Sequence, residues 1–268
     1  MKRICVGFFG FIRNPITYSV FNRFRKLLPE HCTIDIFICC PNKVNEYDAD
    51  TDIIDKDSEI FNEMREELDG YNFYIDVYEY NPLVFIKRVR ELGLPDYTEY
   101  PTYRVFSQHF SITRLCKNIS SISRQSHINY DSIILTRFDT IPGVKTLGSL
   151  VEHVNENTIH IWRRCPYISD IDAEDRIIIS SIGGVHALSH LYDDGFTRNP
   201  RIYEPLIPEN ILGKFLLTCN TLRLLPQEGI LLEHSSSLQV KYSDKAKNYL
   251  NELIDKYKDE LSIEVINQ

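Results

Sequence analysis

The stretch DSIILTRFDTIP, residues 131–142, contains a short apolar run that is followed at once by polar and charged side chains. Residues 132–135 have the character of a buried strand, and Thr136-Arg137-Phe138-Asp139 comes directly after them. Ligands of open α/β sheets bind beyond the carboxyl ends of the strands. The sequence therefore predicts a central strand that brings an arginine and a carboxylate to a ligand-binding edge.

Arg137 and Asp139 are expected to lie on one side of this chain segment, with Phe138 on the other, because side chains alternate along a strand. A carboxylate beside a guanidinium suits a metal-bound diphosphate, with Asp139 on the cation and Arg137 on phosphate oxygen. The alternative is an ion pair at the end of a strand, which has little energetic consequence at a protein surface.

The length and composition are those of a globular protein. The chain has 268 residues, and its 43% of apolar residues can fill the core of one large α/β domain or two small ones. The net charge of -8 argues against a general nucleic-acid binder, which needs a basic surface to displace counterions. We find no repeats and no clear linker, and we predict a single domain over residues 1–268.

The cysteine pattern indicates reduced thiols. Seven is an odd number, no CxxC spacing occurs, and several of the cysteines lie inside apolar runs. We expect no signal peptide and no membrane span, because the N-terminal apolar run is short and soon meets Arg13. The predicted location is therefore cytoplasmic, in a reducing compartment. The cysteines are Cys5, Cys32, Cys39, Cys40, Cys116, Cys165 and Cys219.

Strands and helices are expected to alternate in the first half of the chain, which predicts parallel pairing with right-handed crossovers. Ser58 is a candidate N-cap, and an exposed loop is expected at 93–102. The predicted strands are 4–9, 33–40, 73–80 and 132–136. The predicted helices are 15–28, 58–68 and 103–123.

The second half of the chain is less regular. Strands are expected at 158–162 and 176–181, with a partly extended segment at 221–234. The predicted helices are 185–192, 208–219 and an amphipathic C-terminal helix at 245–261.

Two further motifs suit an anionic ligand and a proton transfer. Gly10-x-x-Arg13 follows the first strand and precedes a helix, so backbone amides, a helix N-terminus and a guanidinium can face an anion. The alternative is an ordinary turn with an exposed arginine. Glu174-Asp175 stands before the strand at 176–181, where it is either a solvated acidic loop or the source of a general base.

The combination resembles the GT-A fold glycosyltransferases. The resemblance lies in short motifs that are spread over most of the chain. In particular, the chain is similar to small soluble transferases of bacterial polysaccharide loci and of large DNA viruses of algae. The motifs are Gly10 to Arg13, Gln108 and Ser111, Tyr130-Asp131, Thr136 to Asp139, Glu174-Asp175 and Pro208-Glu209.

This resemblance implies a Rossmann-related, mixed and mainly parallel sheet flanked by helices. It implies transfer of a sugar from a nucleoside diphosphate donor to a hydroxyl of a glycan, with UDP-sugars favoured and UDP-xylose as one candidate. Residues 1–142 would then bind the donor and residues 143–268 the acceptor. The donor-binding residues implied are Gly10, Phe11, Arg13, Gln108, Arg137, Phe138 and Asp139.

The resemblance also implies a divalent cation, Mn²⁺ or Mg²⁺, and a general base. Asp139 occupies the last acidic place of the family's Asp-x-Asp motif, whereas Arg137 replaces the first acid and can itself neutralise a diphosphate. His234, which ends the run GILLEH, matches the place of a further metal ligand or a phosphate contact, and the alternative is a structural histidine at a strand end. Asp175 matches the base of inverting enzymes, with Glu174 and Glu209 as further catalytic candidates.

Three other functions compete with this interpretation. A sugar nucleotidyltransferase would carry a glycine-rich basic loop after the first strand, and GFFGFIRN is a poor version of one. A nucleotide- or carbohydrate-binding module that has lost activity is favoured by Arg137 in place of an acid. A Rossmann dehydrogenase is disfavoured, because no GxGxxG follows the first strand.

Overall fold

A computed structural model describes the chain at residues 1–12, 25–26, 28–43, 53–94, 102–138, 140–142, 151, 154, 157–163, 173–196, 208–219, 222–225 and 232–234. Within these residues, seven strands form one sheet in the order β3-β2-β1-β4-β7-β6-β8. They are β1 (Arg3–Phe9), β2 (Thr33–Pro41), β3 (Asn72–Tyr78), β4 (Ser132–Arg137), β6 (Ile159–Arg163), β7 (Ala173–Ser180) and β8 (Leu222–Leu225).

The sheet is mixed and mainly parallel, as predicted. Strands β1 to β4 are mutually parallel, and β6 is parallel to β8, whereas β7 runs antiparallel to both of its neighbours, β4 and β6. The sheet is continuous from the first half of the chain into the second. The predicted α/β class, with helices against a mixed sheet, is therefore confirmed.

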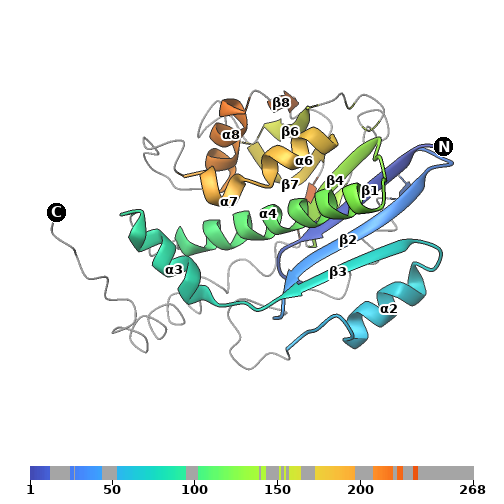
Figure 1. Cartoon of the computed structure of the whole chain (residues 1–268), viewed down its shortest axis with the longest axis horizontal. Helices are drawn as coiled ribbons and strands as arrows, with labels where there is room; N and C mark the ends of the chain where they lie inside the picture. Colours follow the sequence, from blue (N-terminus) through green and yellow to red (C-terminus); the bar gives the residue numbers. More distant parts are fainter. Residues whose placement is uncertain are drawn as a thin grey trace.

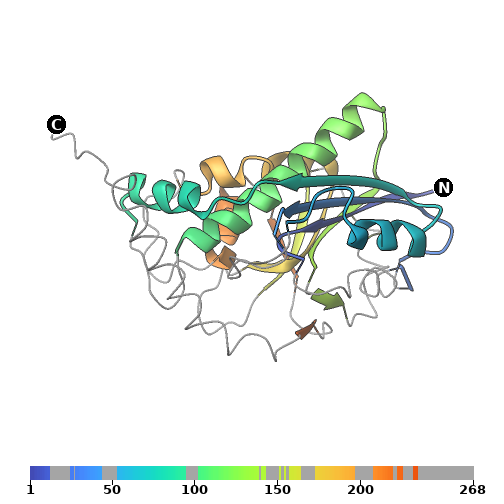
Figure 2. The ribbon, with the colours of Figure 1, turned by 90° about the horizontal axis from the view of Figure 1, so that it is seen from below.

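Helices cover both faces of the sheet (Figures 1 and 2). The long helix α4 (Thr102–Gln125) crosses one face, and α2 (Glu59–Glu67) lies on the opposite face in Figure 2. The remaining helices lie on the side of α4, where α3, α6 and α7 contact α4 and α8 packs against β7. They are α3 (Pro82–Glu91), α6 (Ile182–Leu188), α7 (Leu191–Asp194) and α8 (Pro208–Thr218).

Alternate residues of the central strands are buried on opposite faces. Val6 and Phe8 belong to the apolar cluster that contains Phe61 of α2, whereas Cys5 and Phe9 belong to the cluster of α4. Both faces are covered, so β1 and β2 are nearly continuous apolar runs rather than alternating ones. Each fully buried phenylalanine side chain stabilises the fold by about 1.5–3 kcal/mol.

The helix predicted at 185–192 is wrong in one respect, because the structure divides it into α6 and α7. The hydroxyl of Thr113, on α4, donates to the carbonyl of Leu188 at 3.3 Å and accepts from the amide of Tyr192 at 2.9 Å. It thereby takes the place of the hydrogen bond that would have continued the helix from residue 188 to residue 192.

Two other strand boundaries differ from the predictions. The strand expected at 176–181 is β7, which begins at Ala173. Glu174-Asp175 therefore lies inside the strand, whereas the sequence predicted it just before the strand. The strand expected at 73–80 ends at Tyr78, before Asn81 caps α3 by accepting from the amide of Leu83 at 3.0 Å. The predicted helices at 15–28 and 245–261 lie largely or wholly outside the described residues, as does most of the predicted loop at 93–102.

The described cysteines are free thiols, and all except Cys219 are buried. Burial raises the pKa of the Cys5 and Cys116 thiols, which keeps them protonated and chemically inert. This agrees with the prediction of reduced core residues. Among the described helices, none combines the length and the apolar character that crossing a bilayer requires.

Candidate active site at the carboxyl edge of the sheet

The strand register brings two of the predicted motifs together. Phe9, the last residue of β1, pairs with Arg137, the last residue of β4, so the segments that follow both strands begin side by side. Phe9 also pairs with Cys39 near the end of β2. The carboxyl ends of the parallel strands therefore form one edge, where ligands of such sheets bind.

Gly10 makes the turn that follows β1. Its φ of +89° lies in the left-handed region that residues with a Cβ rarely adopt, and its amide donates to the carbonyl of Cys39 at 3.2 Å. Among the described residues, no atom lies within 4 Å of the point that a Cβ at this position would occupy. The backbone conformation is therefore the reason for a glycine that the described residues show.

Phe11 lies against the end of β3. Its ring meets that of Tyr80 edge-on, with ring centroids 4.9 Å apart. Tyr80 belongs to an apolar cluster that includes residues of α3, α4 and α8, and Phe11 packs against that cluster. Phe11 is partly exposed. Arg13, the guanidinium of the same motif, lies outside the described residues.

The predicted alternation puts Phe138 and Arg137 on opposite sides of the segment, and Phe138 is the more buried of the two. The Phe138 side chain is only 3% exposed and stacks on Phe8 with ring centroids 5.6 Å apart, so it belongs to the core and leaves only its backbone for a ligand. Arg137 is partly exposed at the end of β4. Asp139 lies outside the described residues.

A small two-stranded sheet follows β4. Thr140 begins β5 (Thr140–Pro142) and pairs with His234, which ends β9 (Leu232–His234); Figure 2 shows both strands on the same side of the main sheet as α2. Thr140 is 1% exposed, and its hydroxyl has no hydrogen-bond partner in the part of the chain that is described. His234 is therefore brought beside the residue that follows Asp139.

Glu174-Asp175 also belongs to this edge. Because β7 runs antiparallel to β4, with Ile177 opposite Thr136, the beginning of β7 lies beside the end of β4. The hydroxyl of Thr136 donates to the carbonyl of Arg176 at 3.1 Å, which joins the two strands there. The backbone thus places these two acidic residues beside the segment that contains Arg137.

Glu209 and Gln108 lie on helices. Glu209 is in the first turn of α8, and Ile211, which follows it, is buried in the same apolar cluster that Phe11 packs on. Gln108 is partly exposed on α4. Ser111, one turn further along α4, lies 2.7 Å from the hydroxyl of Tyr78 in a buried hydrogen bond, so it supports the end of β3.

Sequence reasoning missed Asn42, which follows β2 and ties this edge together. Its amide donates to the carbonyl of Tyr78 at 2.7 Å, and its side-chain oxygen accepts from the amide of Tyr80 at 2.9 Å. The sequence pattern that could have identified Asn42 is a polar residue directly after an apolar strand, which is also the pattern that predicted Arg137 at the edge.

Sequence reasoning also missed the ion pair between Asp76 on β3 and Arg114 on α4, at 2.6 Å. Burial alone would raise the pKa of Asp76, but hydrogen bonds from Arg114 and Asn118 outweigh it and hold that pKa below its ordinary value. A carboxylate in the middle of an apolar strand was the available signal.

The predicted metal ligands, Asp139 and the side chain of His234, lie outside the described residues. Among the described residues, no group of three or more His, Cys, Asp or Glu side chains is suited to a metal ion. The buried hydroxyl of Thr140, which has no partner among those residues, is an oxygen of the kind that a divalent cation takes.

The solved structures that match the chain include the following three. The apo form of mouse xyloside xylosyltransferase 1 is 11% identical, with a TM-score of 0.43, over 84% of this chain and 85% of that one. The glycosyltransferase GlyE of Streptococcus pneumoniae TIGR4 is 13% identical, with a TM-score of 0.43, over 96% of this chain and 51% of that one. The apo structure of the bifunctional glycosyltransferase WbbM is 11% identical, with a TM-score of 0.44, over 93% of this chain and 44% of that one.

This chain therefore spans about half the length, or less, of the last two proteins. No family model matches the sequence. No curated protein matches it either. Structural likeness as weak as this carries no statement about activity or ligands.

Proposed function

We propose that this protein is a glycosyltransferase with a GT-A-like fold, which moves a sugar from a nucleoside diphosphate donor to a hydroxyl of a glycan acceptor. The observation that supports this most directly is the strand register. Phe9 pairs with Arg137, Thr136 with Ile177 and Thr140 with His234, so motifs far apart in the sequence belong to one edge of the sheet. UDP-sugars are the favoured donors, with UDP-xylose as one candidate.

The donor's diphosphate is proposed to lie over the turn after β1 and against the end of β4. Gly10, Phe11 and Arg13 would supply backbone amides and a guanidinium on one side, and Arg137 a second guanidinium on the other. The backbone of Phe138 and the side chain of Gln108 complete the proposed donor contacts. Arginines at both positions would balance the negative charge of the phosphates.

Asp139 and His234 are the residues proposed to hold a divalent cation, Mn²⁺ or Mg²⁺. A bound cation would supply stabilisation of the negative charge that develops on the leaving diphosphate. Arg137, which stands two residues before Asp139 where the family has an acid, would offset part of this negative charge. Dependence on metal is therefore expected to be partial rather than absolute.

Asp175 is proposed to be the general base, with Glu174 and Glu209 as further candidates for that role. It would take the proton of the acceptor hydroxyl while that oxygen attacks the anomeric carbon and the bond to the diphosphate breaks, with inversion at the carbon. A base in this role contributes about 10²–10⁴-fold to the rate. Residues 1–142 would hold the donor and residues 143–268 the acceptor, as two halves of one cytoplasmic domain.

Donor binding can be tested by thermal unfolding of the purified protein with a panel of nucleoside diphosphate sugars, each with and without Mn²⁺. A ligand that binds only the folded protein raises the unfolding temperature. We expect a rise with one UDP-sugar, larger with Mn²⁺ and smaller in Asp139→Ala. A rise with none of the donors would contradict the proposal.

Catalysis can be separated from binding by Asp175→Asn. The variant should lose transfer by about 10²–10⁴-fold, measured as release of the nucleoside diphosphate, while the donor still raises its unfolding temperature. Asp57→Asn, an exposed carboxylate before α2, is the matched control and should retain full activity. If the unaltered protein binds a donor but transfers no sugar, it is a binding module of the same fold.

A further inference from the structure

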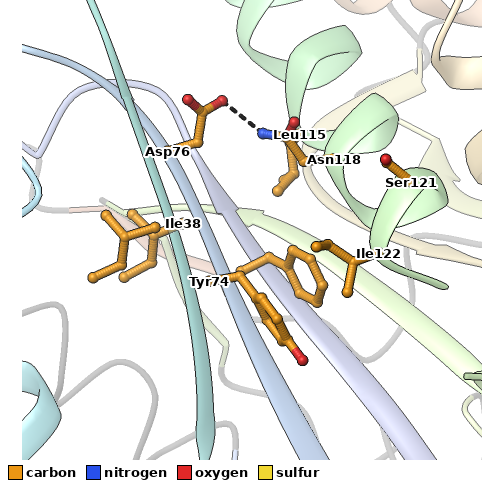
Figure 3. Close-up of a pocket in the computed structure, with 9 residues that line it drawn as sticks. Ile38, Tyr74, Asp76, Leu115, Asn118, Ser121 and Ile122 are labelled. Carbon is orange, nitrogen blue, oxygen red and sulfur yellow. Dashed lines mark hydrogen bonds between the residues drawn. The ribbon is translucent and has the colours of Figure 1, made fainter. Parts of the chain in front are cut away.

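A groove lies between the edge strand β3 and the helix α4, apart from the carboxyl edge of the sheet. Its volume is about 320 Å³, near the lower end for small-molecule sites. The β3 residues that line it precede Tyr78, the last residue of that strand, and its α4 residues come from the C-terminal half of that helix. Figure 3 shows it with Tyr74 and Asp76 on one side and Asn118, Ser121 and Ile122 on the other.

One end of the groove is aromatic and aliphatic. Tyr74 stacks on Phe37 with ring centroids 4.4 Å apart and an angle of 20° between the rings, and Ile122 faces them from the helix. Phe37 is buried, whereas Tyr74 and Ile122 are partly exposed. The groove therefore offers a flat apolar surface that remains open to a ligand.

The other end is polar and held rigidly. Asp76 accepts from Nε and Nη2 of Arg114 at 2.6 and 2.9 Å, and from Nδ2 of Asn118 at 2.6 Å (Figure 3). Because Asn118 donates to Asp76 through its nitrogen, its side-chain oxygen is left as an acceptor. Asp76 also keeps acceptor capacity, since Oδ1 receives a single hydrogen bond within the described residues, and the hydroxyl of Ser121 lies one turn further along α4.

The charges favour a neutral ligand. The carboxylate of Asp76 and the guanidinium of Arg114 form an ion pair at 2.6 Å, so the polar end of the groove has little net charge. The carboxylate would also repel an anion, and the guanidinium would repel a cation. What remains is a set of fixed acceptors and one hydroxyl beside an aromatic ring. A pyranose has matching chemistry, with hydroxyl donors around its rim and an apolar face of C–H groups that packs on aromatic rings.

We propose that this groove is a carbohydrate-binding site that takes one neutral pyranose unit of a glycan. The apolar face of the sugar lies on Tyr74, and its hydroxyls donate to Asp76 and Asn118. This second site does not depend on the proposed transfer reaction. In a transferase that acts on glycans, it would hold a part of the acceptor that is remote from the reacting hydroxyl.

The test uses the methyl glycosides of glucose, galactose, mannose, xylose, rhamnose and N-acetylglucosamine as probes. Binding to the whole protein is followed by the amide ¹H–¹⁵N shifts of residues 74–76 and 118–122. We expect at least one glycoside to shift these amides in a saturable way. If no glycoside shifts them, the proposal is wrong.

Ser121→Trp fills the groove without removing a contact that holds the fold, and Gln125→Trp, an exposed position on the same helix, adds the same bulk outside it. We expect the first variant to weaken glycoside binding at least tenfold and the second to leave it unchanged. Asn118→Leu, which removes the acceptor without filling the groove, should also weaken binding. Unchanged binding in both Ser121→Trp and Asn118→Leu would overturn the proposal.

The same variants separate this site from the proposed active site. Ser121→Trp should retain the rise in unfolding temperature caused by a nucleoside diphosphate sugar, because that donor is proposed to bind at the carboxyl edge. Glycoside binding without any donor binding would support the groove and contradict the proposed transfer reaction. Donor binding without glycoside binding would support the proposed donor site and contradict the carbohydrate site in the groove.

Discussion

The two edges of the sheet differ in how completely their polar groups are engaged. At the amino edge, the carboxylate of Asp35 is fully buried and accepts from Tyr130 at 2.8 Å, from Asn72 at 2.8 Å and from Nε of Arg3 at 3.0 Å. Nη2 of Arg3 forms an ion pair with the same carboxylate at 2.8 Å. These residues come from the beginnings of β1, β2 and β3 and from the segment before β4. One carboxylate thus holds four segments in register.

The carboxyl edge is less closed. No described atom crowds the turn at Gly10, Arg137 is partly exposed, and the buried hydroxyl of Thr140 has no partner among the residues described. The Asp35 network stabilises the amino edge, and the carboxyl edge is where we propose that the donor binds.

The largest effect is expected from Asp35→Ala, which breaks the closed edge. Removing one partner of a buried ion pair costs about 3–5 kcal/mol, and the lower end applies because Arg3 is 32% exposed and can be hydrated. Urea unfolding should show this loss in the free energy of unfolding. The rise in unfolding temperature caused by a donor should persist, because the donor is proposed to bind at the other edge.

Glu63→Ala, an exposed carboxylate on α2, is the control for this experiment and should change stability by less than about 0.5 kcal/mol. A loss below about 1 kcal/mol in Asp35→Ala would mean that the network does not hold the amino edge together.

A matched pair of glycines sharpens the comparison. Gly10 at the carboxyl edge and Gly70, just before β3 at the amino edge, have φ of +89° and +92°, and a Cβ at either would meet no described atom within 4 Å. Gly10→Ala and Gly70→Ala should therefore each lose about 1–2 kcal/mol of stability from backbone strain alone. Only Gly10→Ala should also weaken donor binding, measured by the donor-induced rise in unfolding temperature. Equal donor binding in the two variants would argue against a donor site at Gly10.

The smallest effect is expected from Asp76→Asn, and it depends on pH. The folded protein lowers the pKa of Asp76 below its ordinary value of 3.8, so the carboxylate stabilises the fold above that value and loses this contribution as the pH falls through the lowered pKa. At neutral pH the free energy of unfolding of the variant should be lower by about 1 kcal/mol. This loss is small for hydrogen bonds to a charged group, because the Arg114 side chain is 40% exposed and water screens its charge.

The difference in unfolding free energy between Asp76→Asn and the unaltered protein should shrink as the pH is lowered below about 4. Asp57→Asn, whose carboxylate is exposed, should show no such trend. A difference that stays constant down to pH 2 would show that Asp76 stabilises the fold through packing and not through its charge.

The sequence by itself determined most strands of the main sheet, the helices α2, α4 and α8, and the positions at which polar groups follow the central strands. Residues 4–9 and 132–135 read as buried strands because both faces of β1 and β4 are covered, which leaves a continuous apolar run in the sequence. Gly10 and Arg137 were found because each follows such a run, and strand ends of parallel sheets meet at one edge. Local composition carries this information directly.

The tertiary structure alone decided which distant groups meet. The sequence did not show that Thr113 would divide α6 from α7, that Asp35 would join four segments, or that the antiparallel β7 would bring Glu174-Asp175 beside the end of β4. Each depends on pairing between segments tens of residues apart. A periodic pattern fixes the face on which a residue lies, but the partner it meets there is set by register and packing, which one local stretch does not contain.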